Sequence, residues 1–460
     1  MKEKLKQLND YEWELAENVR EKMRVKAKII ANKKIMNAIE DEAVKQLTNV
    51  ACLPGVVEPV IGLPDMHWGY GLPMGAVSAF DENEGIISAG LCGFDINCGI
   101  NLIRTNLTSK DIIKHQKELV DELFNTIPCG VGSKGKLRLE INELDEVLKT
   151  GMNWAYKKGY ATKEDLKTTE ENGCMKGADP SKVSDLAKKR GKAQLGTLGA
   201  GNHFLEIQKV TNIFEKKFGV KNEDQVLIML HCGSRGLGHQ VATDYLRVQE
   251  KAVKKYNIWL PDQQLACAPA NSQEGQDFFA AMQSAVNYSF TNRAVMTKWI
   301  REVFEKIFKQ SWEDLDMKNV YSIAHNVIKY EKYGNKNLYV HRKGATRSFP
   351  DEPVIIAGSM GTSSYLLKGT ETAMKKTFGS SAHGAGRAMS RNAALKKYRG
   401  ETIQKELLSQ GVCSRATHPR SLAEEAPLAY KDVEEVINSV HGAKISLKVA
   451  RMVPLGVIKG

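Results

Sequence analysis

Five side chains with the chemistry of metal ligands stand in glycine-flanked segments, and each segment follows or precedes a β-prone run. They are Asp95, Cys98, His203, His231 and His325. A carboxylate, a thiolate and three imidazoles suit Mn²⁺, Zn²⁺ or Fe²⁺ better than Ca²⁺, and a bridging thiolate would let them hold two adjacent ions. The alternative is that they are separate buried side chains. Their positions in loops beside glycine favour a functional site.

A further histidine stands apart from this group, in the segment Ser380-Ser-Ala-His-Gly-Ala-Gly-Arg387. The pattern predicts that His383 precedes a helix beginning near Gly386, with Arg387 close by. An imidazole beside bound phosphates can act as a nucleophile or as a general acid. The alternative is a purely structural segment in which Ser381 caps the helix.

Three glycine loops have the composition of phosphate-binding turns: residues 130–135, 233–238 and 358–362. Glycine lets backbone N–H groups converge on an anion, and Lys134 or Arg235 would neutralise its charge. None of the loops matches a Walker or a Rossmann pattern, and each one alone is equally typical of a simple turn. Four basic residues lie beside glycine-rich loops and are therefore candidates for contacts with RNA phosphates: Arg190, Lys192, Arg235 and Arg387.

Composition restricts the class of protein. The chain has 460 residues, which allows two or three modules or one large enzyme body, and its 42% of hydrophobic residues predicts a folded globular protein. It lacks both a long apolar run and an apolar N-terminal signal, so we expect a cytoplasmic protein without membrane contact. Its eight cysteines form no CxxC pair and are expected to be reduced thiols. The net charge of +12 favours a polyanionic partner, although aromatic residues make up only 7% and form no stripe between basic ones.

The elements that must position these residues are mixed. Helical periodicity predicts a helical N-terminal segment over residues 1–53, and short strands with tight turns follow from Pro54. Strands are predicted at 225–230 and 353–356, long helix at 273–308, and strand again at the apolar C-terminus. No linker divides the chain after residue 53, so the prediction is an α+β fold with one large catalytic body of mixed sheets flanked by helices, covering residues 54–460.

A series of long motifs resembles the RtcB family of GTP-dependent RNA ligases from about Pro54 to the last residue. The motifs are Gly93-Phe-Asp-Ile-Asn-Cys-Gly99, Gly201-Asn-His-Phe-Leu-Glu206, His231-Cys-Gly-Ser-Arg-Gly-Leu-Gly-His239, Ala324-His-Asn326, His341-Arg-Lys-Gly-Ala-Thr-Arg347 and Ser381-Ala-His-Gly-Ala-Gly-Arg387. Cys232 departs from the Ser or Thr that is common after the ligand histidine, and it offers a second soft donor near the metals.

The resemblance implies a reaction. Members of the family use Mn²⁺ and GTP to join an RNA end that carries a 3′-phosphate, or a 2′,3′-cyclic phosphate hydrolysed first, to an end that carries a 5′-hydroxyl. His383 matches the nucleophile that takes GMP from GTP, and the GMP then activates the RNA 3′-end. The substrate class fits tRNA splicing or RNA repair, and the sequence leaves open which of them applies and whether an accessory activator protein takes part.

The resemblance also implies residue roles. Asp95, Cys98 and His203 match the ligands of one Mn²⁺ ion, and Cys98, His231 and His325 match those of the second. The residues that match the GTP pocket are Asn202, Glu206, Asn326, Ser359, Met360, Ser364, Gly384, Ala385, Tyr430 and Lys459. In this scheme Tyr430 contacts the base, Glu206 accepts hydrogen bonds from guanine, and Lys459 reaches the nucleotide.

Two other functions fit parts of the pattern. A metal-dependent phosphoesterase acting on RNA ends would use the same ligands with water as nucleophile, and it would leave His383 without a role. A non-catalytic RNA-binding protein fits the positive charge, but the sequence shows no aromatic platform for stacking bases.

Overall fold

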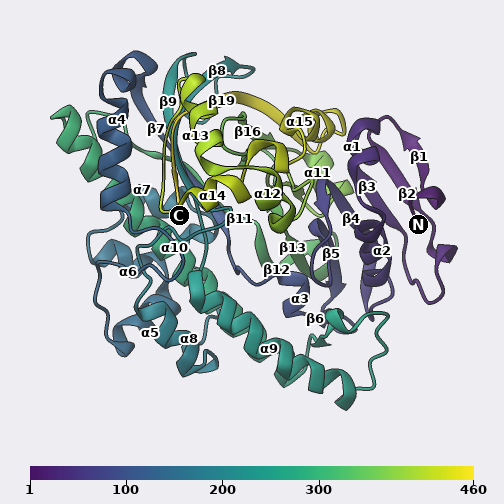
Figure 1. Ribbon diagram of the computed structural model, residues 1–460. Helices are drawn as coiled ribbons and strands as arrows, with labels where there is room; N and C mark the ends of the chain where they lie inside the picture. Colours follow the sequence, from purple (N-terminus) through teal and green to yellow (C-terminus); the bar gives the residue numbers. More distant parts are fainter.

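A computed structural model describes residues 1–460 and shows two large sheets surrounded by helices (Figure 1). The seven-stranded sheet has the order β1-β2-β3-β4-β5-β13-β12. Its strands are β1 (Lys6–Asn9), β2 (Glu12–Leu15), β3 (Ala27–Ile30), β4 (Val56–His67), β5 (Met74–Asp81), β12 (Asn326–Tyr333) and β13 (Lys336–Lys343). The eight-stranded sheet contains β7 (Gly99–Thr108), β8 (Phe204–Ile213), β9 (Gln225–Cys232), β11 (Asn319–Ala324), β15 (Pro353–Ile356), β16 (Ser364–Gly369), β18 (Cys413–Ala416) and β19 (Ser446–Lys459).

Two small two-stranded sheets complete the β-structure. They pair β6 (Ile86–Ile87) with β10 (Ala268–Pro269), and β14 (Ala345–Arg347) with β17 (Ser380–Ala382). The second pair brings the segment before His383 against the chain that leaves β13.

The α-helices are α1 (Lys33–Ala38), α2 (Asp41–Val50), α3 (Ala89–Cys92), α4 (Ser109–Thr126), α5 (Ile141–Thr150), α6 (Met152–Lys157), α7 (Lys163–Lys167), α8 (Asp185–Lys192), α9 (Arg235–Lys255), α10 (Gln273–Phe308), α11 (Glu371–Lys376), α12 (Arg391–Lys397), α13 (Gly400–Ser409), α14 (Pro419–Glu424) and α15 (Val433–Gly442). Short 3₁₀ helices occupy Lys2–Lys4, Glu17–Val19, Glu170–Gly173, Pro180–Lys182, Gln263–Leu265 and Pro427–Ala429. No helix is both long and apolar enough to cross a lipid bilayer.

The α+β prediction is confirmed, and several elements lie where the sequence placed them. The strands β9 and β15, the helix α10 and the C-terminal strand β19 match the predicted segments. All eight cysteines are free thiols, as expected. The C-terminus is a strand because β19 pairs with β8 on one side and β16 on the other, which buries its apolar side chains.

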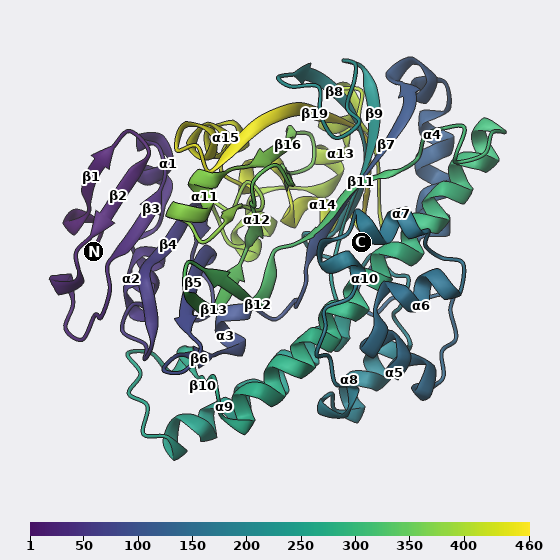
Figure 2. The same ribbon diagram turned by 180° about the vertical axis from the view of Figure 1, so that it is seen from behind.

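The N-terminal segment differs from the helical prediction. Helices α1 and α2 cover residues 33–50, where Ile35, Val44 and Leu47 supplied the periodicity, but β1, β2 and β3 precede them. These strands lie at one edge of the molecule, opposite α4 (Figures 1 and 2). The edge strand β1 is exposed throughout, so its sequence carries no alternation that could reveal it. Strand β3, from the segment before residue 53, pairs with β4, from the segment after it. The division of the chain into residues 1–53 and 54–460 remains a prediction.

The region after His383 also differs from its prediction. No helix begins near Gly386, because α12 starts only at Arg391 with Ser390 as its N-cap. Gly386 has a φ of 72° and lies so close to the backbone of Asp65 that a Cβ atom there would be 2.2 Å from the Asp65 carbonyl oxygen. The glycines around His383 therefore serve close backbone approach rather than a helix start.

We expect the eight-stranded sheet to set the stability of the molecule. Ile207 on β8 is fully buried over Gly456 of β19, so Ile207→Ala should lower the free energy of unfolding by about 2–5 kcal/mol because it leaves a cavity. The matched control is Ile113→Ala on α4, where the side chain is 58% exposed and the expected change is below about 0.5 kcal/mol. Thermal melting followed by circular dichroism compares them, and equal midpoints would contradict the prediction.

Candidate active site

The five predicted metal ligands meet at one end of the eight-stranded sheet. Cys98 directly precedes β7, His231 lies near the end of the neighbouring strand β9, and His203 directly precedes β8. His325 occupies the turn between β11 and β12, and Asp95 lies in the loop before Cys98. Because β7 pairs antiparallel with both β9 and β11, Cys98 comes close to His325, although more than 200 positions separate them in the sequence.

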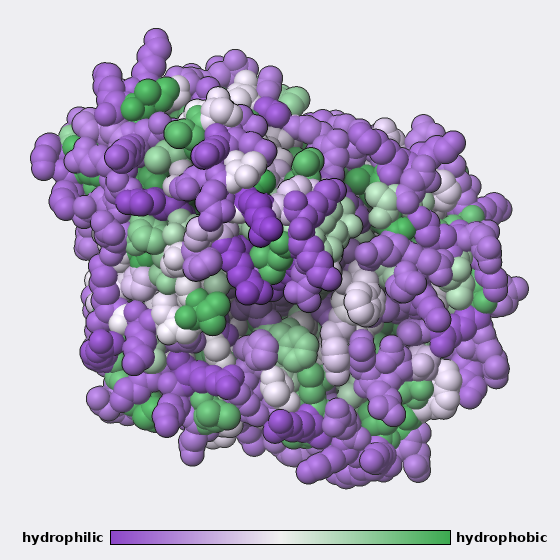
Figure 3. Space-filling view, in the orientation of Figure 1, coloured by the Kyte–Doolittle hydropathy of each residue, from purple (hydrophilic) through white to green (hydrophobic).

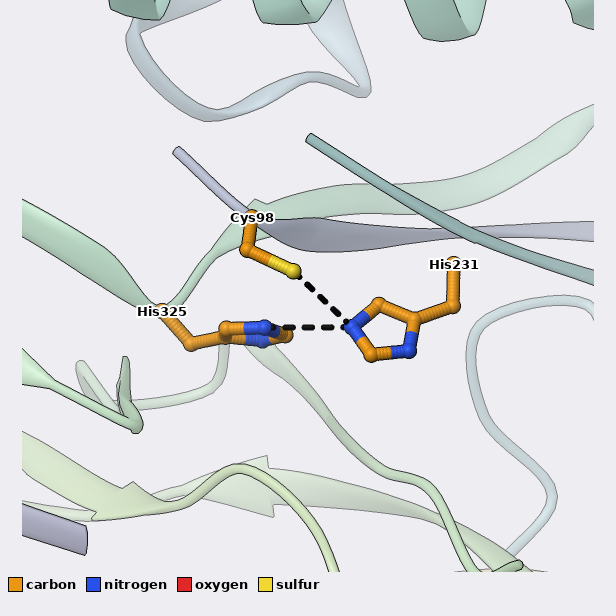
Figure 4. A group of neighbouring side chains, drawn as sticks. All are labelled: Cys98, His231 and His325. Carbon is orange, nitrogen blue, oxygen red and sulfur yellow. Dashed lines mark hydrogen bonds between the residues drawn. The ribbon is translucent and has the colours of Figure 1, made fainter. Parts of the chain in front are cut away.

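The ligand atoms form two groups that share one sulfur atom. Cys98, His231 and His325 form one group, Asp95, Cys98 and His203 form the other, and within each group the atoms lie within 4.8 Å of one another. The Cys98 Sγ atom is 3.2 Å from His231 Nε2, which in turn is 3.2 Å from His325 Nε2 (Figure 4). On the other side, Cys98 Sγ lies 3.4 Å from His203 Nε2, and that nitrogen lies 2.8 Å from Asp95 Oδ2.

Backbone carbonyl groups fix how two of the imidazoles face the centre. The Nδ1 atom of His203 lies 2.9 Å from the Leu198 oxygen, and that of His231 lies 3.1 Å from the Asn202 oxygen. Each Nδ1 is thus placed to donate to a carbonyl group, which turns each Nε2 toward the cluster. Donor atoms that face one another in this way fit a bound divalent cation. Burial lowers the pKa of His203, but the nearby Cys232, Cys98 and Asp95 side chains outweigh it and hold that pKa well above its usual range, so this imidazole must lose a proton before it can bind a cation.

Burial controls the protonation of these ligands. Burial, together with the charge of the nearby Asp95 carboxylate, raises the pKa of the Cys98 thiol to about 12. It also lowers the pKa of His231 and of His325 well below the usual range, so both imidazoles are neutral. Neutral imidazoles are the ligand form, whereas the thiol must lose its proton when a metal binds.

Cys232 points away from this cluster. Its Sγ atom donates to the carbonyl oxygen atoms of Thr197 and Leu198, at 3.3 and 3.0 Å, and it belongs to neither ligand group. The departure at this position therefore adds no ligand to the cluster.

His383 lies beside the cluster and is held by a carboxylate. Its ring centroid is 4.7 Å from that of His325. The Oδ2 atom of Asp65 accepts hydrogen bonds from His383 Nδ1 at 2.6 Å, from the His383 backbone N–H at 3.0 Å and from the Gly384 N–H at 3.3 Å. Asp65 is fully buried at the end of β4. With Nδ1 engaged by Asp65, the His383 Nε2 atom is the ring nitrogen left to face the cavity.

Asp65 was not among the predicted site residues. It is the one acidic residue in the otherwise apolar segment from Val60 to Met66, a pattern that could have indicated a functional carboxylate. Sequence analysis also missed Lys343, a buried residue of the cavity wall that donates a 3.0 Å hydrogen bond to the Gly90 carbonyl. Burial lowers the pKa of Lys343 to about 7. Both residues come from the seven-stranded sheet, so the site is built where the two sheets meet.

A cavity of about 350 Å³ joins the cluster, His383 and most of the predicted nucleotide residues. The molecule is hollowed near the middle of the face seen in Figure 3. Of the predicted residues, the cavity wall contains Asp95, Cys98, Asn202, His231, His325, Asn326, Ser359, Met360, His383, Gly384, Ala385, Arg387, Tyr430 and Lys459. A cavity of this size is typical of small-ligand sites.

Glu206 and Ser364 do not line the cavity. Gln208 joins them, because its Nε2 atom donates to Glu206 Oε2 at 2.7 Å and to Ser364 Oγ at 3.1 Å. Nearby, the Lys459 ammonium group reaches the cavity wall from β19 and donates to the carbonyl oxygen of Gly201 at 2.9 Å. The buried C-terminal strand thus delivers Lys459 to a fixed place.

The four predicted phosphate-binding cations lie in different environments. Arg387 lines the cavity but already pairs with Glu425 at 3.3 Å, and its guanidinium lies over the Tyr430 ring. Lys192 pairs with Glu140 at 3.0 Å, and Arg235 donates to Thr197 Oγ1. Arg190 is exposed on α8. The structure therefore brings only Arg387 to the cavity wall.

Comparison with known proteins identifies the family. The family model described as tRNA-splicing ligase RtcB matches residues 46–460. The chain belongs to the RtcB family. It is 51% identical to a tRNA-splicing ligase RtcB of Archaeoglobus fulgidus, over 99% of both chains. It is also 50% identical to one of Methanococcus maripaludis over the full length of both, and 48% identical to one of Thermococcus kodakarensis over 99% of both. The resemblance seen in the motifs is thus confirmed for this RtcB chain.

The buried carboxyl of Glu206 predicts a pH-dependent stability. Burial raises the pKa of Glu206 from 4.5 to about 7 in the folded protein. Between pH 4.5 and 7 the folded protein holds the Glu206 proton more tightly than the unfolded chain does. The free energy of unfolding therefore falls as the pH rises through this range, and the decrease levels off above pH 7 at about 3 kcal/mol. Glu206→Gln cannot ionise, so it should raise the melting temperature relative to wild type at pH 8 and leave it nearly unchanged at pH 4.5.

The matched control is Glu118→Gln, since the Glu118 side chain is 66% exposed and should show no such difference. A Glu206→Gln protein that melts below wild type at pH 8 would contradict this account of the buried carboxyl.

Proposed function

We propose that this chain is an RNA ligase that joins 3′-phosphate or 2′,3′-cyclic phosphate ends to 5′-hydroxyl ends through a covalent histidine–GMP intermediate. The observation that carries the proposal is the placement of His383 on the wall of the same cavity as the ligand cluster, with Nδ1 bonded to Asp65. A phosphoesterase would need the cluster alone, whereas the Asp65–His383 pair supplies a nucleophile. The names of the relatives and the net charge of +12 support an RNA substrate, in tRNA splicing or RNA repair.

In the first step, the lone pair of His383 Nε2 attacks the α-phosphorus of GTP. A P–N bond forms, the bond from the α-phosphorus to the β-bridging oxygen breaks, and pyrophosphate leaves with the electron pair. The Nδ1–H group stays bonded to Asp65, whose carboxylate stabilises the positive charge that develops on the ring. Asp65 thereby acts as the orienting group of the nucleophile.

In the next two steps the activated group moves to RNA and is then lost. A 3′-phosphate oxygen attacks the same phosphorus, the P–N bond breaks, and His383 is released. The 5′-hydroxyl oxygen of the second RNA end then attacks the RNA 3′-phosphate, and GMP leaves as the phosphodiester forms. A 2′,3′-cyclic phosphate must first be opened by water to the 3′-phosphate.

Two Mn²⁺ ions would be held by Asp95, Cys98 and His203 and by Cys98, His231 and His325, and they would supply positive charge against the phosphate oxygens. Mixed thiolate, imidazole and carboxylate donors suit Mn²⁺ or Zn²⁺. The fold keeps Cys98 and the three imidazoles buried, and it holds the partly exposed Asp95 beside them.

The GTP pocket follows the cavity wall. We assign Asn202, Asn326, Ser359, Met360, Gly384, Ala385, Tyr430 and Lys459 to it, and Glu206 and Ser364 to its support through Gln208. Arg387 stacks on Tyr430 and pairs with Glu425, which fixes the Tyr430 ring at one side of the cavity. Arg190, Lys192 and Arg235 are assigned to RNA phosphates outside the cavity.

The covalent step can be tested with α-labelled GTP and Mn²⁺. His383→Ala should retain no acid-labile label while its circular dichroism spectrum and metal content stay at the wild-type level, because the nucleophile is not a ligand. Asp65→Asn should label about 10²–10⁴-fold more slowly, since the amide cannot accept the Nδ1 proton and both backbone donors in the same way. His115→Ala, a change on the exposed face of α4, is the matched control.

Labelling of the folded His383→Ala protein would exclude this residue as the nucleophile. Absence of label in the wild-type protein, together with hydrolysis of RNA 2′,3′-cyclic phosphates, would instead favour a phosphoesterase.

Because the Cys98 sulfur belongs to both ligand groups, removing it should reduce Mn²⁺ binding more than removing a single imidazole does. Cys98→Ala should bind less Mn²⁺ than His325→Ala, because the thiolate serves both groups and the imidazole serves one. Cys267→Ala is the matched control, since this cysteine is fully buried but belongs to neither group. Metal analysis after equilibrium dialysis measures the effect, and full retention of one ion by Cys98→Ala would rule out a bridging role.

A further inference from the structure

Three arginine side chains are buried in the interior, and they differ in what balances their charge. Arg293, Arg301 and Arg342 are at most 2% exposed. Arg301 pairs with Asp165 at 2.7 Å and Arg342 pairs with Glu331 at 2.7 Å, each through two nitrogen atoms. Arg293 forms no ion pair with any carboxylate. A buried cation without a counter-charge is costly, so its position calls for a reason beyond packing.

The hydrogen bonds of Arg293 lead to the metal ligands. Its Nη1 atom donates to the carbonyl oxygen of Asn97 at 3.0 Å and to that of Cys232 at 2.9 Å. Asn97 directly precedes Cys98, and Cys232 directly follows His231. One guanidinium group therefore joins the two segments that carry these ligands, which come from different strands.

The surrounding turn of α10 supports the same contact. Ser289 donates to the Asn97 carbonyl at 2.7 Å and also accepts a hydrogen bond from Arg293 Nη1 at 2.9 Å. The Asn97 side chain in turn donates to the Val286 carbonyl at 2.9 Å. Asn97 has a φ of 53°, in the left-handed region, so the backbone before Cys98 takes a conformation that needs such fixed partners.

We propose that Arg293 is a positioning residue of the metal site, which clamps the Cys98 loop to the end of β9 and so fixes the thiolate against the His231 imidazole. The inference rests on the proposed function, since it concerns the same ligands. The Nη1 atom donates to both carbonyl groups while Nε donates to Ser322 Oγ at 3.2 Å, so the planar guanidinium is held in one orientation. A lysine ammonium group lacks this planar set of donors.

The test uses Co²⁺ as a spectroscopic probe of the full-length protein. Arg293→Met should bind Co²⁺ about 10–100-fold more weakly than wild type and show a reduced thiolate-to-cobalt charge-transfer band, as expected when a support of a ligand is removed. Arg293→Lys should recover part of the affinity because it keeps the charge and one donor. Arg301→Met, on the same helix, is the matched control, and it should melt at a lower temperature yet keep the wild-type Co²⁺ affinity and band.

Each outcome decides the inference. Wild-type affinity and spectrum in Arg293→Met would overturn it, and so would an equal loss of affinity in Arg301→Met, because the effect would then be general destabilisation. If Arg293→Met does not fold, equal Co²⁺ affinity in Arg293→Lys and Arg301→Lys would overturn it. Failure of the wild-type protein itself to bind Co²⁺ would reject the proposed metal site together with the inference. If the wild-type protein binds Co²⁺, the metal site stands, and the Arg293 variants then test the positioning role alone.

Discussion

The antiparallel pairing of β7 with β9 and β11 is the constraint on which the site depends. It sets the Gly99 register against Cys232 and Ala324, so Cys98, His231 and His325 reach the same end of the sheet. A slip of one residue would turn every side chain of a strand to the opposite face. The alternation of buried side chains on both faces of β7 and β9 therefore fixes the ligand geometry as well as the core.

Buried polar side chains on helix α10 help to hold the loops that carry the candidate ligands. Every residue of helix α10 from Ala281 to Thr297 is buried, yet this stretch contains Asn287, Asn292 and Arg293. Their side chains bond to backbone groups of other segments. Asn292, for example, accepts from the Gly196 N–H at 2.7 Å and donates to the Gly233 carbonyl at 3.2 Å. Buried polar groups are tolerated when they are satisfied in this way, and they specify one arrangement of the loops.

His383 reaches the cavity from a different set of elements than the candidate ligands do. Asp65 lies near the end of β4 in the seven-stranded sheet, and His383 follows β17, which pairs with β14. The close approach of Gly386 to Asp65 lets the segment after His383 pass over the end of β4. The junction of the two sheets thus sets the relative positions of the imidazole and the ligand cluster, and no single element could do so.

The sequence by itself predicted the candidate ligands and singled out His383, and it identified the family, because these depend on residue identity within short motifs. It also determined β9, α10 and β19, whose long apolar patterns are local. Tertiary structure alone decided the rest. The exposed strand β1 has no pattern of its own, the partnership of Asp65 with His383 spans 318 positions, and the contact of Arg293 with Asn97 spans 196. Such pairings depend on which strands and helices pack together, and burial, which sets the pKa of Glu206 and Cys98, exists only after that packing.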